Sequence, residues 1–263
     1  MVNKNLKRFY AILVFIFLYA PIIVLIIYSF NDSKLRGSWN GFTLKWYYEL
    51  FKNKEALRAL YYTLIIALSS SIISTVLGTF AAIGIHGMRG LNKKVILNLN
   101  YLPVLNPDIV TAVALMALFR LAHINFGLFS LLLAHITFSV PYVILSILPK
   151  LKQMNVYLAE AAMDLGATPF YSLRKIIIPQ ILPGIITGAL LAFTLSIDDF
   201  VISFFTTGHG ISNLSIYIYS MARKGINPII NALSTLMFIF MIVLLLIINY
   251  RSEKTEKLIE ERR

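Results

Sequence analysis

The chain has 263 residues, of which 58% are hydrophobic and only 14% are charged. Soluble domains contain about 45–50% apolar and about 25% charged residues, so this composition excludes an ordinary soluble domain, and its wealth of aliphatic residues excludes a disordered chain. The net charge is +12 and there is no cysteine, which excludes disulfides, thiolate metal sites and cysteine nucleophiles. The composition therefore indicates a protein that exposes much of its surface to lipid.

Six apolar stretches follow one another along the chain. A helix needs about 20 apolar residues to cross the hydrocarbon core of a bilayer, and each stretch reaches or approaches that length. They cover residues 9–30, 61–85, 95–119, 126–148, 181–207 and 228–250. The first exceeds the apolar region of a signal peptide, and no small-residue cleavage pattern follows it, so we expect a retained helix. The sequence thus predicts an all-α membrane protein with six transmembrane helices.

The basic residues predict the orientation of these helices. Most of the 24 Lys and Arg residues flank the spans on the side of the N-terminus. Cytoplasmic loops carry an excess of Lys and Arg, so both termini are expected inside the cell, an N-in/C-in arrangement. Residues 1–56 then form the first helix and an outer loop, residues 57–250 the main transmembrane domain, and residues 251–263 a charged cytoplasmic tail. The positive charge flanks the membrane and needs no nucleic acid to explain it.

The outer loop is rich in aromatic residues, namely Trp39, Trp46, Tyr47 and Tyr48, and Lys45 lies among them. Aromatic and basic residues at the end of a span are typical of anchors in the membrane interface. Contact with an extracytoplasmic partner is the alternative interpretation.

Motifs of enzymes are missing from the sequence. It contains neither the phosphate-binding pattern G-x-x-x-x-G-K-[ST] nor the nucleophile pattern G-x-S-x-G, and its four histidines never have the spacing of metal ligands. We therefore predict no catalytic residue, no metal site and no cofactor in this chain. A transport, receptor or scaffold component of a membrane is the favoured class.

The most informative segment is the connection 150–180, between the fourth and fifth spans on the predicted cytoplasmic side. It contains a short predicted helix that ends at a glycine, made of Glu160, Ala161, Ala162, Met163, Asp164, Leu165 and Gly166. Pro169 is suited to begin the next helix. Ala161 and Ala162 allow close approach by a partner, and Glu160 and Asp164 share one side of the helix. An ordinary surface loop is the alternative on pattern alone.

The spacing of Glu160-Ala161-Ala162, Gly166, Ile176 and Ile178-Pro179 resembles the EAA loop of type I ABC importer permeases. That family has Leu before the final proline, and Ile178 is a conservative departure. Two further segments most resemble the spermidine/putrescine permease subunits of the PotC type: Asn106-Pro107-Asp108-Ile109-Val110 and Ser196-Ile197-Asp198-Asp199-Phe200-Val201.

The resemblance covers residues 57–250 and implies the type I ABC importer permease fold with a cytoplasmic coupling helix. It implies that Glu160, Ala161, Ala162, Asp164 and Gly166 couple the spans to a cytoplasmic ATPase dimer, which binds the ATP and Mg. The other implied partners are a homologous permease subunit, an extracytoplasmic polyamine-binding protein and a small cationic substrate. The implied location is the bacterial cytoplasmic (inner) membrane, as a multi-pass protein.

Asp108, Asp198 and Asp199 are the acidic residues that fall within the predicted spans. An ionised side chain at the bilayer centre costs about 2.5–3.5 kcal/mol on insertion scales, so each needs a compensating role. For Asp198 and Asp199, a path or gate for a cation is one interpretation, and structural pairing with a backbone amide or a sister subunit is the other. Adjacent residues of a helix point about 100° apart, so the two need not face one cavity.

Asp108 follows Asn106-Pro107, a pattern that favours a broken helix in which Asn106 or Asp108 satisfies the freed amides, with a path role as the alternative. Cation–π contacts with ammonium groups are predicted for several aromatic residues, although aromatics at span ends also form interfacial belts. These residues are Phe200, Phe204, Phe205, Tyr217 and Tyr219.

Three alternatives remain open. The chain is a permease for another substrate, such as thiamine, ferric iron, sulfate or phosphonate; an anion is disfavoured if Asp198 or Asp199 lines the path. It is a stand-alone secondary transporter or channel, which leaves the segment around Glu160 unexplained. It is a structural scaffold, against which the three intramembrane carboxylates argue.

Overall fold

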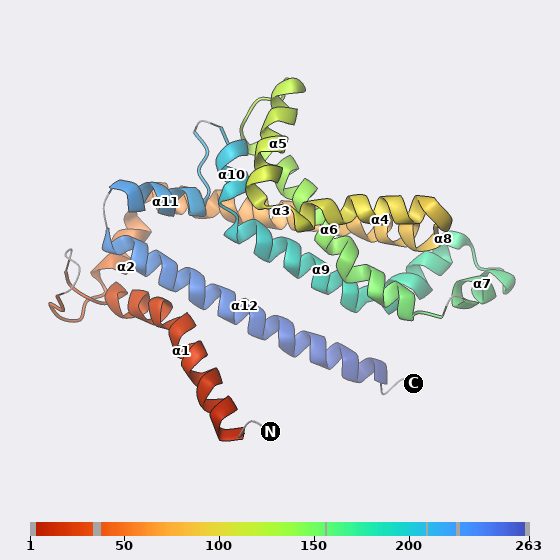
Figure 1. Cartoon of the computed structure of the whole chain (residues 1–263), viewed down its shortest axis with the longest axis horizontal. Helices are drawn as coiled ribbons and strands as arrows, with labels where there is room; N and C mark the ends of the chain where they lie inside the picture. Colours follow the sequence, from red (N-terminus) through yellow and green to blue (C-terminus); the bar gives the residue numbers. More distant parts are fainter. Residues whose placement is uncertain (1–3, 34–37, 156, 209, 225–226, 261–263) are drawn as a thin grey trace. The chain divides into compact units, whose positions relative to one another are not determined.

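The computed structural model describes residues 4–33, 38–155, 157–208, 210–224 and 227–260, and helices make up most of them (Figure 1). Lys34, Arg36 and the end of the charged tail lie outside the described residues. The helices are α1 (Lys4–Ser29), α2 (Lys45–Lys52), α3 (Lys54–Gly87), α4 (Gly90–Leu105), α5 (Asp108–Leu121), α6 (Leu128–Gln153), α7 (Tyr157–Asp164), α8 (Pro169–Ser172), the π-helical turn η1 (Leu173–Ile177), α9 (Ile178–Asp198), α10 (Val201–Thr206), α11 (Leu214–Lys224) and α12 (Pro228–Glu260).

Five helical segments are long and apolar enough to cross a membrane: Leu6–Ser29, Lys54–Gly87, Leu128–Gln153, Pro169–Asp198 and Pro228–Leu246. A sixth span is present if the bent pair α4 and α5 is counted as one, because these two helices meet at an angle of 108°. The apolar stretch 95–119 is therefore divided between these two helices. Asn106 adopts extended backbone angles before Pro107, since a proline disfavours the helical conformation in the residue that precedes it. The predicted break is confirmed, but no side-chain hydrogen bond caps the start of α5.

The prediction of one helix over residues 181–207 is wrong. α9 ends at Asp198, Asp199 has an extended backbone, and α10 begins at Val201. All three acidic residues that the sequence placed within spans therefore lie at helix ends, because Asp108 is the first residue of α5. Unpaired backbone amides, which a carboxylate can accept from, are found only at the start of a helix.

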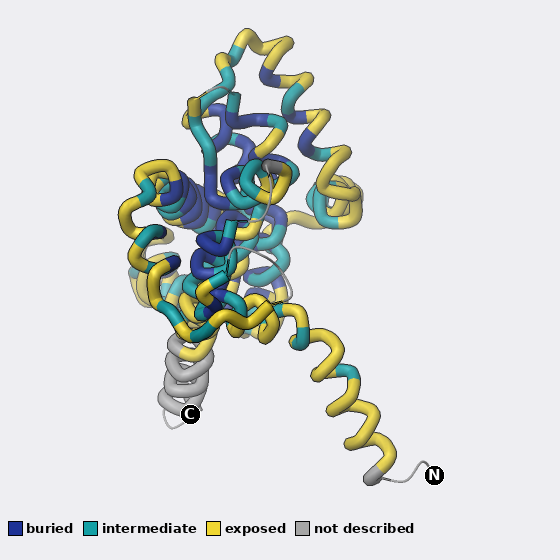
Figure 2. Tube along the Cα trace, turned by 90° about the vertical axis from the view of Figure 1, so that its left-hand side faces the viewer, coloured by how far each residue is buried: buried dark blue, intermediate teal, exposed yellow. Residues whose placement is uncertain are grey.

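The chain divides into two compact units, each described here by itself. Unit 1 consists of Met1–Arg58 and Tyr217–Arg263, and unit 2 of Ala59–Ile216. Within unit 1, α12 packs against α1 and α2. Side chains of α1 are exposed along almost its whole length, as Figure 2 shows. That exposure fits a helix surrounded by lipid.

The loop that follows α1 in unit 1 folds over Trp46, which is only 1% exposed. The indole Nε1 donates a hydrogen bond to the carbonyl of Asn31 at 2.8 Å. The side chain of Asn31 closes the loop by donating to the carbonyl of Ser38 and accepting from the amide of Asn40. Trp46 is thus a small core of the loop and no membrane anchor, whereas Trp39 is 56% exposed.

Unit 2 is built around the antiparallel pair α6 and α9, against which α3 packs. Buried side chains of the three helices form one apolar cluster, which includes Ile85, Val143, Ile147 and Ile181. Gly188 makes close approach possible, because a Cβ atom there would lie 3.1 Å from the Cα atom of Val143. Gly184, one turn earlier, repeats the pattern with a Cβ position 3.0 Å from the carbonyl oxygen of Ser146. Small residues four apart are a common device for packing helices within membranes.

A second apolar cluster joins α5, α6 and α10. Its buried members are Ala112, Leu115, Phe119, Ala134, Phe138 and Ile202. The short helix α10 is therefore packed against the long helix α6 at the end of the α6–α9 pair that lies away from α7 (Figure 1).

Candidate coupling helix and transport site

The predicted coupling helix is α7, and Gly166 ends it as expected. The φ angle of Gly166 is +88°, in the left-handed region that glycine adopts without strain. Its amide donates to the carbonyl of Met163 at 2.9 Å, and the amide of Ala167 donates to the carbonyl of Ala162 at 3.0 Å. This pair of bonds is a Schellman motif, which satisfies the last carbonyls of a helix.

The next helix starts where the sequence predicted. The hydroxyl of Thr168 accepts a hydrogen bond from the amide of Tyr171 at 3.2 Å, and Pro169 occupies the first turn of α8. Proline suits this position because the first amides of a helix have no partner within it. The π-helical turn η1 then continues α8 into α9.

The segment formed by α7 and α8 presents apolar and acidic side chains to its surroundings. Glu160, Ala161, Asp164 and Gly166 are exposed, and Ala162 is half-buried. Three apolar side chains of the segment are among the most exposed in the described chain: Leu165 at 91%, Tyr157 at 72% and Phe170 at 70%. Apolar groups gathered in this way on an exposed segment are typical of an interaction surface.

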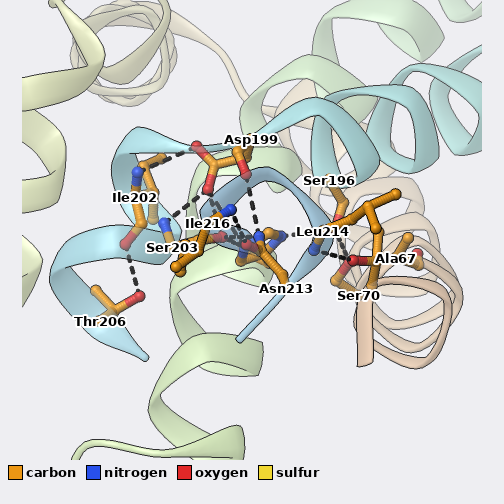
Figure 3. Close-up of polar contacts among 12 residues, drawn as sticks. Ala67, Ser70, Ser196, Asp199, Ile202, Ser203, Thr206, Asn213, Leu214 and Ile216 are labelled. Atoms are coloured by element: carbon orange, nitrogen blue, oxygen red, sulfur yellow. Dashed lines mark hydrogen bonds and ion pairs between the residues drawn. The ribbon is translucent and has the colours of Figure 1, made fainter. Parts of the chain in front are cut away.

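At the other end of the α6–α9 pair, the carboxylate of Asp199 organises the start of α10 (Figure 3). Its Oδ1 accepts a hydrogen bond from the amide of Ile202 at 3.1 Å. Its Oδ2 accepts from both the amide and the hydroxyl of Ser203, each at 2.7 Å. Asp199 thus acts as an N-terminal cap, and this agrees with the interpretation in which one of the paired aspartates binds backbone amides.

The polar cluster continues from Ser203 into the helices α6, α9 and α3. His135 of α6 is fully buried, with its Nε2 atom 3.0 Å from the hydroxyl of Ser203 and 3.6 Å from Oδ2 of Asp199. Its Nδ1 atom lies 2.6 Å from the hydroxyl of Ser196, which in turn accepts a hydrogen bond from Ser70 at 3.1 Å.

Asn213 completes this cluster from the segment before α11. Its amide nitrogen donates to the hydroxyl of Ser203 at 2.7 Å and to the carbonyl of Asp199 at 3.1 Å. Its oxygen accepts from the amide of Ile216 at 3.0 Å. Figure 3 shows Asn213 joined by hydrogen bonds to both Asp199 and Ser203.

Asp198 has a different environment from its neighbour. It is the last residue of α9 and is exposed, whereas the side chain of Asp199 is 8% exposed. The ring of Phe200 lies 5.5 Å from that of Phe204, which is 50% exposed and lies 5.6 Å from the ring of Phe205. An acidic and an aromatic group therefore meet at the α9–α10 turn of unit 2.

The remaining predicted path residues lie elsewhere. Asp108 is exposed at the bend between α4 and α5. Tyr217 belongs to unit 1, is 5% exposed, and accepts a hydrogen bond from Asn53 at 3.0 Å. Tyr219, also of unit 1, is 42% exposed, with the guanidinium of Arg223 5.8 Å from its ring centre.

Sequence reasoning missed five members of the polar cluster: Ser70, His135, Ser196, Ser203 and Asn213. One signal pointed to it, because His135 is an ionisable residue within a predicted span and such residues are rarely without a role. Serine and asparagine are too common to be singled out without knowing which side chains the fold brings together.

The chain matches known proteins over most of its length. The family described as "Binding-protein-dependent transport system inner membrane component" matches residues 74–254. The chain is 39% identical over 246 residues to the spermidine/putrescine transport system permease protein PotC of Escherichia coli (strain K12), a match that covers 94% of this chain and 93% of PotC. It is 42% identical over 231 residues to the putrescine transport system permease protein PotI of the same strain, covering 84% and 82% respectively.

Solved structures share the fold at lower sequence identity. A bacterial ABC transporter that imports the acidic polysaccharide alginate has a chain with a TM-score of 0.70 and 19% identity, covering 95% of this chain and 98% of that one. A chain of the MetNI methionine ABC transporter has a TM-score of 0.59 and 19% identity, covering 75% and 93%. Together with the EAA-type segment and the apolar spans, these matches identify the chain as a member of the binding-protein-dependent transport system inner membrane components, the permeases of ABC importers.

Proposed function

We propose that this chain is the permease subunit of an ATP-driven importer that carries polyamines, namely spermidine and putrescine, into the cytoplasm. The observation that carries the proposal is the identity of 39% with PotC across nearly the full length of both proteins. The identity of 42% with PotI supports the same class of substrate.

The exposed segment of α7 and α8 supports a role in coupling to an ATPase. Glu160 and Asp164 supply charge, and Leu165 supplies an apolar side chain that is 91% exposed. A cytoplasmic ATPase dimer, which binds the ATP and Mg, docks on this segment and drives the motion. The chain itself holds no cofactor in this proposal and hydrolyses no ATP.

The α9–α10 turn supports a role in passing a cation. A polyamine carries several ammonium groups, and an exposed carboxylate replaces part of their hydration, as the ring face of an aromatic side chain also does. Asp198 meets the first requirement, because it is exposed, and Phe200 and Phe204, whose rings are 5.5 Å apart, follow it in the sequence. Asp108 is a second exposed carboxylate of unit 2. Tyr217 and Tyr219 stay predictions as path residues.

The proposed assembly contains a homologous permease subunit and an extracytoplasmic polyamine-binding protein. Transport proceeds by alternating access. ATP closes the ATPase dimer, the coupling helices move, and the path opens outward to accept the polyamine from the binding protein.

The experiment is uptake of radiolabelled spermidine by the complete complex in proteoliposomes with ATP inside the lumen or outside, according to the side of the ATPase. We expect uptake that requires ATP, is inhibited by excess putrescine, and is unaffected by thiamine or sulfate. Uptake of thiamine in place of spermidine contradicts the substrate, and uptake without the ATPase subunits contradicts the mechanism.

Two substitutions test the assigned residues in the same assay. Glu160→Lys reverses a charge on α7, and we expect loss of both ATPase association and uptake, whereas Glu160→Gln keeps the size of the side chain and retains association. Asp198→Asn removes the exposed carboxylate, and we expect slower spermidine uptake with ATPase association unchanged. Parental uptake by Asp198→Asn removes this residue from the path.

A further inference from the structure

We propose that His135 is a positioning residue for the α9–α10 turn: a one-way chain of hydrogen bonds through His135 holds Asp199 inward and thereby presents Asp198 outward to the transported cation. The role of Asp198 in this proposal rests on the proposed function. The holding of the turn does not, because it follows from contacts within unit 2.

The direction of each hydrogen bond is fixed by proton counting. A carboxylate only accepts, so the single hydroxyl proton of Ser203 goes to Asp199 Oδ2, at 2.7 Å. The Nε2 atom of His135, 3.0 Å from the same hydroxyl oxygen, must then be the donor. His135 is therefore assigned as the tautomer with its proton on Nε2.

The other ring nitrogen extends the chain in the same direction. Ser70 donates its proton to Ser196 at 3.1 Å, so the proton of Ser196 is free to be donated to Nδ1 of His135 at 2.6 Å. The chain thus runs from α3 through α9 and α6 to the capping carboxylate. Reversal of any single bond leaves two donors or two acceptors facing one another, which in a buried site is unfavourable.

Burial makes this arrangement hard to replace with water. Ser70, His135 and Ser203 are fully buried, Ser196 is 1% exposed and Asn213 is 2% exposed. Asn213 adds a second restraint, because it bonds both the hydroxyl of Ser203 and the backbone carbonyl of Asp199. None of these side chains is exposed enough to touch a substrate, so their effect on transport is exerted through the position of the turn.

The far end of α10 is held by the same helix α6. The hydroxyl of Ser130 donates to the carbonyl of Thr206 at 2.7 Å. Both ends of α10 are therefore attached to α6, and Ile202 between them packs into the second apolar cluster. Loss of His135 releases only the end that carries Asp198, Asp199 and Phe200.

The test compares two replacements of His135 in the complete complex. His135→Phe keeps an aromatic ring but makes neither hydrogen bond, and His135→Gln keeps a donor toward Ser203. We expect His135→Phe to lower the number of spermidine molecules imported per ATP hydrolysed about tenfold, the factor that corresponds to 1.4 kcal/mol. The ATPase activity stimulated by the loaded binding protein stays within about twofold of the parent, because α7 is untouched. His135→Gln recovers at least half of the lost coupling.

A second readout follows the position of α10 without reference to substrate. The chain contains no cysteine, so a cysteine placed at Ile202, which is 2% exposed, is the single thiol of this subunit, and its labelling by a water-soluble thiol reagent is read on this subunit after the treated complex is separated into its chains. We expect His135→Phe to speed labelling of Ile202→Cys about tenfold, on the same conversion. Ile147→Cys is the matched control, because Ile147 is fully buried in the other apolar cluster and its labelling should not change.

Parental coupling and parental labelling in His135→Phe overturn the proposal. Equal acceleration at Ile202→Cys and Ile147→Cys, together with falling ATPase activity, also overturns it, because it shows a general loss of folding. If the parental complex imports no spermidine, the proposed function fails, while the labelling experiment still decides whether His135 holds the turn.

Discussion

Two turns of unit 2 lie at opposite ends of the α6–α9 pair, and they are held in different ways. The turn between α7 and α8 is made by nearby residues, through the Schellman motif at Gly166 and the cap of Thr168. The turn between α9 and α10 is held by side chains that are distant in the sequence, since Asp199 is connected to His135 through Ser203.

This difference indicates what each turn can do. A turn held by its own backbone keeps its shape while its exposed side chains meet a partner. A turn held by buried side chains of several helices follows those helices whenever they move. Because α6 and α9 form one packed pair between the two turns, we expect a displacement at the α7–α8 turn to reach the Asp199 turn through that pair.

The largest effect is expected where the two turns are joined. Gly188→Leu places a side chain where even a Cβ atom would lie 3.1 Å from Val143. We expect a loss of stability of about 3 kcal/mol or failure to assemble, because overpacked cores shift the backbone. The measurement is the thermal unfolding midpoint of the purified complex. Gly84→Leu is the control, since nothing lies within 4 Å of its Cβ position. Equal losses of stability in Gly188→Leu and Gly84→Leu would contradict the close packing of α9 against α6.

The next largest effect is expected at Ser203, which belongs to the polar cluster, in comparison with Ser139, a buried serine outside it. Ser203→Ala leaves His135, Asp199 and Asn213 each short of a partner, and we expect a loss of about 1–3 kcal/mol. Ser139 is equally buried, and its hydroxyl has no hydrogen-bond partner within the described chain. Ser139→Ala should therefore leave the unfolding midpoint unchanged. A midpoint that falls as far in Ser139→Ala as in Ser203→Ala would refute the importance of the polar cluster.

A smaller effect is expected at the locally made turn. Gly166→Ala forces a side chain into a backbone with φ of +88°, which costs about 1–2 kcal/mol for an L-residue. Gly87→Ala is the control, because its Cβ position is open and its φ is not positive. Calorimetry of the complex checks the prediction, together with ATPase association, which should weaken in Gly166→Ala alone. Unchanged values in both variants would mean that the turn adapts freely.

The smallest effect on stability is expected at the exposed surface of α7. Leu165→Ser changes the unfolding free energy by less than about 0.5 kcal/mol, as surface substitutions usually do. The affinity for the ATPase subunits should nevertheless fall about tenfold, in the range of an interface residue that matters. Leu121→Ser is the matched control, because Leu121 is 79% exposed at the end of unit 2 remote from α7. The affinity of each variant is measured by binding of the ATPase subunits to immobilised permease. An equal loss of affinity in Leu121→Ser would place the interface elsewhere.

Local signals in the sequence were sufficient to predict the turn between α7 and α8. Gly166, Thr168 and Pro169 each act on backbone atoms within a few residues, so their roles follow from the order of the residues alone. The apolar spans were equally readable, because lipid requires about 20 apolar residues per helix. The N-in/C-in orientation stays a prediction, as do the boundaries at residues 56 and 250.

The turn between α9 and α10 was harder to predict, because the residues that hold it are far apart along the chain. Asp198 and Asp199 look alike in sequence, yet Asp198 is exposed whereas the side chain of Asp199 is only 8% exposed. Asp199 differs from Asp198 because it is connected to His135, a residue that lies 61 positions before Ser196 in the sequence and yet contacts it in the fold. Their placement within one continuous helix was wrong for the same reason, since the two aspartates are the only charged residues of the stretch 181–207 and no proline or glycine follows them within it.

The folded loop that follows α1 in unit 1 determines the tryptophan fluorescence of the chain. Its two tryptophans, Trp39 and Trp46, both lie in this loop, one half exposed and the other shielded by the carbonyl of Asn31 and its neighbours. All indole emission of this chain therefore originates within eight residues on one side of the first span. The tryptophan fluorescence of this chain therefore reports on that single segment and does not report directly on the helices of unit 2.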